Sequence, residues 1–307
     1  IDYSTLIQSR FSNINSIAVW GGEDNNPPIY GKIFVAIEPQ PGTVITQTDK
    51  DTIVRDIIKP RSVVTTQVEF VEPETIYIGL NVNVDYDRTI TSLTSARIAS
   101  EVRTVINNYF DTSLNKLEKN FYYSSLSGLI NNTTKSIFSN TMQVVAHKRL
   151  QYYAGSTNTF DINFNFNITE GSFKSTNFHT TISGVDYDVY ISDTGGAAGT
   201  LVVKKVSDDS ILITNIGTIS YTAGTINIPS ILINSLSGNV SYIRFYANPT
   251  GNSPNIYAAG VTRQQAASTS AIFPEISRNT VISLDTSSEN LAANIPVGIT
   301  VTATPNG

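Results

Sequence analysis

The sequence predicts an α+β protein: a mainly antiparallel N-terminal sheet with helices on one face, an all-β sandwich-like domain, and a short irregular C-terminal segment. The order of strands and helices in the first half, the loss of helical periodicity near Leu150 and the polar composition support this prediction. Charged residues make up only 15 % of the 307, below the roughly 25 % usual for soluble domains. The Ser, Thr, Asn and Tyr that replace them suit strands with polar faces. We expect domains at 1–148, 149–250 and 251–307.

The first elements are two strands and a helix. Ile14–Trp20 reads as a short strand that Gly21 and Gly22 end. A loop rich in Asn and Pro follows, and Ile29–Glu38 is then a buried strand closed by Pro39. A helix begins near Thr48, because an acidic residue follows this capping residue by three positions, and Pro60 ends it.

Two strands and the clearest helix come next. Ser62–Val71 is rich in β-branched residues, and Thr75–Tyr86 alternates apolar and polar side chains, so we expect a hairpin joined at Glu72-Pro73. Thr94–Phe110 carries one apolar stripe at helical spacing. After a further short helix, Ser136–Ala146 returns as a strand, which places the helices on one face of the sheet.

Short strands separated by glycine-containing turns fill the region after Leu150, a pattern typical of a β-sandwich or small barrel. The expected strands are Phe160–Phe166, Tyr187–Ile191, Leu201–Val206, Ile211–Ile216, Thr225–Ile228 and Val240–Tyr246. Thr250–Ser270 reads as a linker, and two weak strands, Val281–Leu284 and Gly298–Thr302, follow in a polar tail.

Composition excludes several classes of protein. The absence of cysteine excludes disulfides, thiolate metal sites and a cysteine nucleophile. The two histidines, His147 and His179, are too far apart in the sequence for a multi-histidine metal site. No apolar run is long enough to span a membrane, and a net charge of -5 argues against nucleic-acid binding.

The sequence contains no recognisable catalytic motif. Glu23-Asp24, Asp208-Asp209 and the pair Asp85 and Asp87 lie in loops or at a strand end, where solvated turn carboxylates are the ordinary interpretation. His147, beside two basic residues at a domain boundary, is expected at the surface. We therefore expect no enzyme activity, no cofactor, no metal and no small-molecule substrate.

Residues Val19–Pro39, VWGGEDNNPPIYGKIFVAIEP, resemble the baseplate J-like family, the wedge proteins of contractile-tailed bacteriophages. The order of elements through residue 146 agrees with this resemblance, including the long helix that ends in Asn-Tyr-Phe. In the second half, Gly217–Ile228, GTISYTAGTINI, is similar to a β-turn motif of the longer wedge subunits of T4-like phages. The resemblance points to the C-terminal half of such a subunit, and hence to a piece of a longer polypeptide.

The resemblance implies a structural role in the virion. Members of the family form homodimers, join neighbouring wedges into a ring around the central hub, and contact other wedge proteins and the sheath-initiating protein. The ring rearranges when the tail contracts, and assembly takes place in the cytoplasm of the bacterial host. The family has no catalytic residues to transfer to this chain. A phage tail protein that binds a carbohydrate or receptor is the alternative, with the Tyr- and Asn-rich residues 152–190 as a sugar-binding groove or as ordinary cross-strand pairs.

The segment that begins at Trp20 is the expected contact or anchoring loop. Its aromatic residues suit protein contacts, in which aromatic side chains are enriched and Lys and Glu are depleted. A buried tryptophan that merely fixes the loop to the sheet is the alternative interpretation. The candidate residues are Trp20, Gly21, Gly22, Asn26, Pro27, Pro28 and Tyr30.

Overall fold

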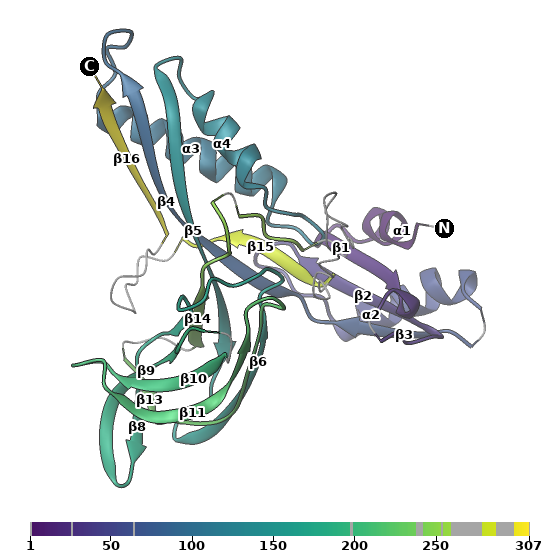
Figure 1. Cartoon of the computed structure of the whole chain (residues 1–307). Helices are drawn as coiled ribbons and strands as arrows, with labels where there is room; N and C mark the ends of the chain where they lie inside the picture. Colours follow the sequence, from purple (N-terminus) through teal and green to yellow (C-terminus); the bar gives the residue numbers. More distant parts are fainter. Residues whose placement is uncertain are drawn as a thin grey trace, which may run out of the picture. The chain divides into compact units, whose positions relative to one another are not determined.

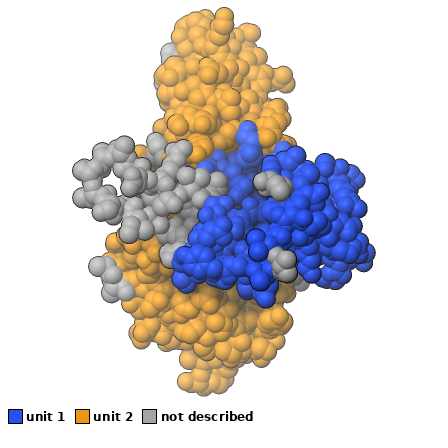
Figure 2. Space-filling model, turned by 90° about the vertical axis from the view of Figure 1, so that its right-hand side faces the viewer, with its two compact units in different colours: residues 1–75, 113–120, 257–282 blue, residues 76–112, 121–256, 283–307 orange. Residues whose placement is uncertain are grey.

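The computed structural model describes residues 2–25, 27–63, 65–196, 199–237, 242–252, 254–258, 278–286 and 298–306. The fold is mixed α+β and mostly sheet, as predicted (Figure 1). Packing divides the chain into two compact units, coloured separately in Figure 2. Unit 1 comprises residues 1–75, 113–120 and 257–282, and unit 2 comprises 76–112, 121–256 and 283–307. These units gather segments that are distant in sequence, so they divide the chain differently from the three predicted ranges.

Unit 1 contains a three-stranded sheet in the order β1-β2-β3. Strand β1 (Ile14–Gly21) is antiparallel to β2 (Lys32–Pro39), whereas β3 (Gln67–Val71) is parallel to β2. A helical crossover makes the parallel pairing possible, because it brings the chain back to the edge of the sheet at which β2 begins. The crossover contains α2 (Gln47–Thr52), η2 (Ile53–Ile58) and η3 (Lys59–Arg61).

The prediction of one N-terminal sheet is therefore wrong, and so is the hairpin at Glu72-Pro73. Strand β3 pairs with β2, whereas β4 (Glu74–Asp87) pairs with β5 (Ile137–Gln151). The apolar pattern of each strand was read correctly, but alternation does not state which neighbour a strand will choose. The predicted helix begins one residue earlier than Thr48, with Thr46 and Asp49 forming its capping box.

Both faces of the unit 1 sheet are covered. On one face, Ile7 of α1 (Tyr3–Arg10) packs with Ile53 and Ile57 against Val35. The sequence prediction missed α1, whose N-terminus Asp2 caps through its side chain. The other face buries one cluster, whose members are Ala18, Trp20, Phe34, Ala36, Leu117 and Val281.

Unit 2 contains the long antiparallel pair β4 and β5 and two helices. The helices α3 (Ser95–Ser113) and α4 (Tyr123–Asn131) lie along the same side of this pair in Figure 1. Strand β16 (Ile299–Asn306) extends the sheet by pairing parallel to β4. The apolar stripe predicted for the long helix is confirmed, since its buried residues are Ile98, Val102, Ile106, Tyr109 and Phe110.

The region after residue 150 forms a small barrel, one of the two predicted alternatives. Among the described residues, neighbouring strands run β8-β9-β10-β11-β12, and β13, one residue beyond β12, pairs back with β8. Strands β6, β7, β14 and β15 belong to the same hydrogen-bonded sheet. The bounds are β6 (Ser156–Asn163), β7 (Lys174–Ser175), β8 (Phe178–Ile182), β9 (Val185–Asp193), β10 (Thr200–Lys205), β11 (Ile211–Ser220), β12 (Thr225–Ile233), β13 (Ser235–Leu236), β14 (Tyr242–Ala247) and β15 (Thr280–Leu284).

Aromatic side chains of β14 and β6 pack against one another next to this barrel. The ring of Phe245 on β14 lies 5.1 Å from that of Phe160 on β6 and stacks on Phe173 at 5.9 Å. Such ring contacts stabilise the sheet by more than the burial of their apolar surface alone would. Three predicted segments lie partly outside the described residues: residue 64 of the strand 62–71, residues 240–241 of the strand 240–246, and residues 253 and 259–270 of the linker.

Candidate functional site

The candidate loop begins with a tight turn after β1. Gly22 opens a short 3-10 helix, η1 (Gly22–Asp24), and its carbonyl accepts hydrogen bonds from the amides of Asn25 (3.2 Å) and Ile29 (2.7 Å). A Cβ atom at this position would lie 1.9 Å from the Ile29 carbonyl oxygen. Only glycine therefore allows the chain to close the loop in this way.

Trp20 lies on the inner side of the loop. Its side chain is only 8 % exposed and stacks on Phe34, with ring centroids 5.6 Å apart. The indole Nε1 donates a hydrogen bond to Asn25 Oδ1 at 2.9 Å, which satisfies its polar atom and holds the turn. This geometry makes Trp20 an anchor between the sheet and the loop.

Tyr30 lies on the outer side of the same loop. It is 79 % exposed, and its neighbour Ile29 is 41 % exposed. The next residue, Gly31, accepts a hydrogen bond from the Gln67 amide (2.9 Å), which joins the loop to the start of β3. We call the exposed residues Ile29 and Tyr30 the outer patch.

The remaining candidate residues divide between these two sides. Gly21 is the last residue of β1, and Pro27 and Pro28 are exposed. Asn26 lies outside the described residues. Asp24 forms an ion pair with Arg278 at 3.2 Å, a contact that sequence reasoning missed because Arg278 is distant in the chain.

His147 is not a surface residue, and the prediction that placed it there is wrong. It is 1 % exposed and stacks on Tyr77 of the paired strand β4, with ring centroids 5.2 Å apart. Arg149 Nε donates a hydrogen bond to its Nε2 at 3.2 Å, and Arg149 also pairs with the buried Asp285 at 2.9 Å. The error arose because Asp285 lies far along the chain from β5 and gives no local signal.

Burial determines the charge state of His147. Its pKa is lowered to about 3, chiefly by desolvation; the charge of Asp285 opposes this shift, and the charges of Arg149 and Arg244 add to it. A neutral imidazole is also what the hydrogen bond from Arg149 requires, because Nε2 must act as an acceptor. This cluster joins β4 and β5 to the segment at Asp285.

Four of the carboxylates considered in the sequence accept hydrogen bonds from neighbouring residues. Asp85 accepts a hydrogen bond from Ser139 (2.7 Å), and Asp209 accepts one from Tyr190 (2.6 Å). Hydrogen bonds from Thr89 lower the pKa of Asp87, and hydrogen bonds from Ser210 lower the pKa of Asp208. Within the described parts of the chain, no group of three or more metal-ligating side chains could hold an ion.

One side-chain amide of the Tyr- and Asn-rich region has a structural role. Asn158 is buried; its Oδ1 accepts a hydrogen bond from the Tyr153 amide at 2.8 Å, and its Nδ2 donates one to the Tyr153 carbonyl at 3.1 Å. Asn158 therefore organises the turn before β6. No helix in the described ranges is long and apolar enough to cross a membrane.

Comparison with known families gives two matches on consecutive stretches. Residues 1–71 match the model for baseplate structural protein gp6, C-terminal domain I, and residues 74–149 match that for C-terminal domain III of the same protein. No curated protein matches the chain. The gap between the matches falls at the connection between β3 and β4. These matches support a structural role in a phage baseplate, and therefore a place in the tail of the virion.

Proposed function

We propose that this chain is a structural subunit of the wedge in a contractile phage tail baseplate. The observation that carries the proposal is the pair of adjoining matches to domains of one baseplate protein, which together extend from α1 to β5. The first match covers residues 1–71 of unit 1, and the second covers most of β4 and β5 together with the helices α3 and α4 between them. The chain then acts by binding other proteins and performs no catalysis.

The proposed assembly is a homodimer that joins neighbouring wedges into a ring around the hub. A closed ring of dimers requires two different interfaces on each subunit: one joins the two subunits of a dimer, and the other joins neighbouring dimers. In this proposal the ring also contacts other wedge proteins and the sheath-initiating protein. It assembles in the host cytoplasm and rearranges when the tail contracts. The sequence resemblance to the baseplate J-like family is the source of these details.

The outer patch is the proposed protein contact on unit 1. Tyrosine is enriched at the energetic centres of interfaces, because it combines a large apolar ring with a polar end. Tyr30 meets this description, since 79 % of its surface is exposed and it projects from a loop that Trp20 anchors. An exposed ring on a rigid support loses little entropy when a partner binds.

Replacement of Tyr30 by Asp tests this contact. We expect Tyr30→Asp to weaken self-association at least tenfold in sedimentation equilibrium, the loss expected for a central interface residue. Tyr153→Asp is the matched control, because Tyr153 is 71 % exposed but lies in unit 2. If both variants associated as tightly as the unchanged chain, Tyr30 would not be part of the interface.

A further inference from the structure

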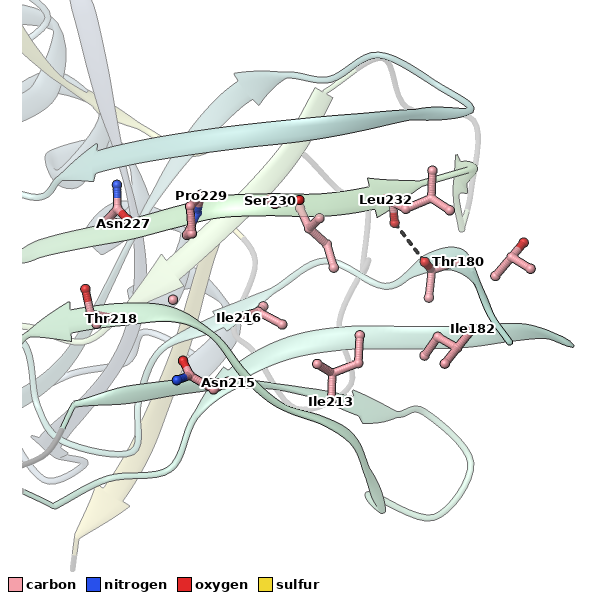
Figure 3. Close-up of a pocket in the computed structure, with 13 residues that line it drawn as sticks. Thr180, Ile182, Ile213, Asn215, Ile216, Thr218, Asn227, Pro229, Ser230 and Leu232 are labelled. Carbon is pink, nitrogen blue, oxygen red and sulfur yellow. Dashed lines mark hydrogen bonds between the residues drawn. The ribbon is translucent and has the colours of Figure 1, made fainter. Parts of the chain in front are cut away.

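One side of the barrel has a groove where β11 separates from β12. The two strands pair only from Thr218 to Ser220, opposite Thr225 to Asn227. Before Thr218, β11 continues along β10 alone, while β12 continues along β6. The space left between them has a volume of about 570 Å³, and β8 contributes Thr180, Thr181 and Ile182 at one end (Figure 3).

Strand edges form the walls of this groove. Within the described residues, 213–216 of β11 pair with no strand on the groove side, and 180–182 of β8 pair only with β9. Such edges present backbone N–H and C=O groups that a further strand can satisfy. Small-molecule sites, in contrast, combine an apolar cavity with a few convergent polar side chains.

The side chains along the groove are apolar or uncharged. Ile182, Ile213 and Ile216 point into it in Figure 3, and the described lining includes no charged residue. The charges lie at its two ends. Asp186 accepts a hydrogen bond from Thr181 at one end, and Asp161 accepts one from Asn227 at the other. Both carboxylates belong to exposed residues.

We propose that this groove binds an extended segment of another protein, which adds as a β-strand between β11 and the strands β12 and β8. The segment carries aliphatic or threonine side chains at alternate positions, because successive side chains of a strand point to opposite faces. It carries a basic residue near each end, complementary to Asp161 and Asp186. Backbone hydrogen bonds supply the affinity, and the isoleucine-lined floor supplies the selectivity.

The proposal depends on the barrel alone and not on the baseplate role. The test therefore uses a synthetic probe: a labelled peptide of about six residues, the usual strand length, with alternating valine and threonine between two terminal lysines. Fluorescence anisotropy with the whole chain measures its affinity. Two comparison peptides replace the lysines by glutamate or the central valine by proline, which cannot donate a backbone hydrogen bond.

We expect the lysine-ended peptide to bind, and both comparison peptides to bind at least tenfold more weakly. Ile213→Asp should weaken binding by a similar factor, whereas Ile211→Asp should not, because Ile211 lies on the same strand outside the groove and is 49 % exposed. Peptide addition to the unchanged chain should also slow amide hydrogen exchange at 213–216. Absence of binding, equal affinity of the proline peptide, or unchanged exchange at 213–216 would overturn the proposal.

Discussion

Trp20 and Tyr30 belong to one loop but have opposite environments. The ring of Trp20 is buried against Phe34, whereas Tyr30 is largely exposed. The sequence left open whether this loop is an anchor or a contact surface. The structure assigns anchoring to the first aromatic residue and leaves the second one accessible.

Substitution of the two aromatic residues separates these roles. Trp20→Ala should reduce the free energy of unfolding by about 3 kcal/mol, because it removes a large buried side chain and leaves a cavity. Tyr30→Ala should change it by less than about 0.5 kcal/mol, as for most exposed positions. Urea unfolding followed by circular dichroism measures both values. Equal losses in the two variants would contradict the assignment of Trp20 as the anchor.

His147 makes stability depend on pH. Its pKa is 6.5 in an unfolded chain and about 3 in the folded protein. Between these values the unfolded state binds the extra proton, so the free energy of unfolding rises with pH. We expect the unchanged chain to lose about 2 kcal/mol through this residue between pH 7 and pH 4.5.

One substitution isolates the contribution of His147. Urea unfolding at both pH values should show a flatter pH dependence for His147→Gln than for the unchanged chain. If both proteins lost stability equally on acidification, His147 would not be the buried, neutral residue described here.

At the level of elements, the long helix α3 was the easiest to predict. Its apolar residues recur at helical spacing over several turns, so local sequence alone identifies both the helix and its buried face. The prediction failed for β3, because alternation indicates a strand but not its partner. The parallel pair of β2 and β3 arises from the helical crossover and depends on contacts that are distant in sequence.

A charge on the buried face of α3 tests that face directly. Val102 is fully buried, so Val102→Asp should cost several kcal/mol and abolish the cooperative unfolding of unit 2. Arg103→Asp is the matched control, because the next residue along the helix is exposed. Thermal melting by circular dichroism reports the result. A cooperative transition retained by Val102→Asp would show that the helix packs through another face.

The similarity noted at Gly217–Ile228 has a physical explanation in the β11–β12 hairpin. A Cβ atom on Gly217 would lie 2.1 Å from the Asn227 carbonyl oxygen, and Gly224 has a φ of +69°. Tyr221, between them, donates a hydrogen bond to the buried Asp193 at 2.8 Å. In this motif, Gly217 therefore permits the close approach of two strands, and Gly224 permits the turn. Tyr221 anchors the hairpin to a buried carboxylate.

At the scale of the molecule, sequence predicted the α+β class and most of the elements, because local periodicity specifies helices and strands. It did not predict the partners that join distant segments. Two ion pairs are examples, and no local sequence pattern indicates either of them: Arg149 with Asp285, and Asp24 with Arg278. The sequence named Tyr30 as a candidate contact residue, but for the same reason it did not predict the barrel groove.

The central claim is that the chain is a structural part of a phage tail baseplate. Immunogold electron microscopy tests it most directly, with antibodies against this chain applied to intact and contracted particles of the phage that encodes it. We predict label at the baseplate end of the tail in both states. Label on the capsid or along the fibres, or tails without label, would contradict the claim.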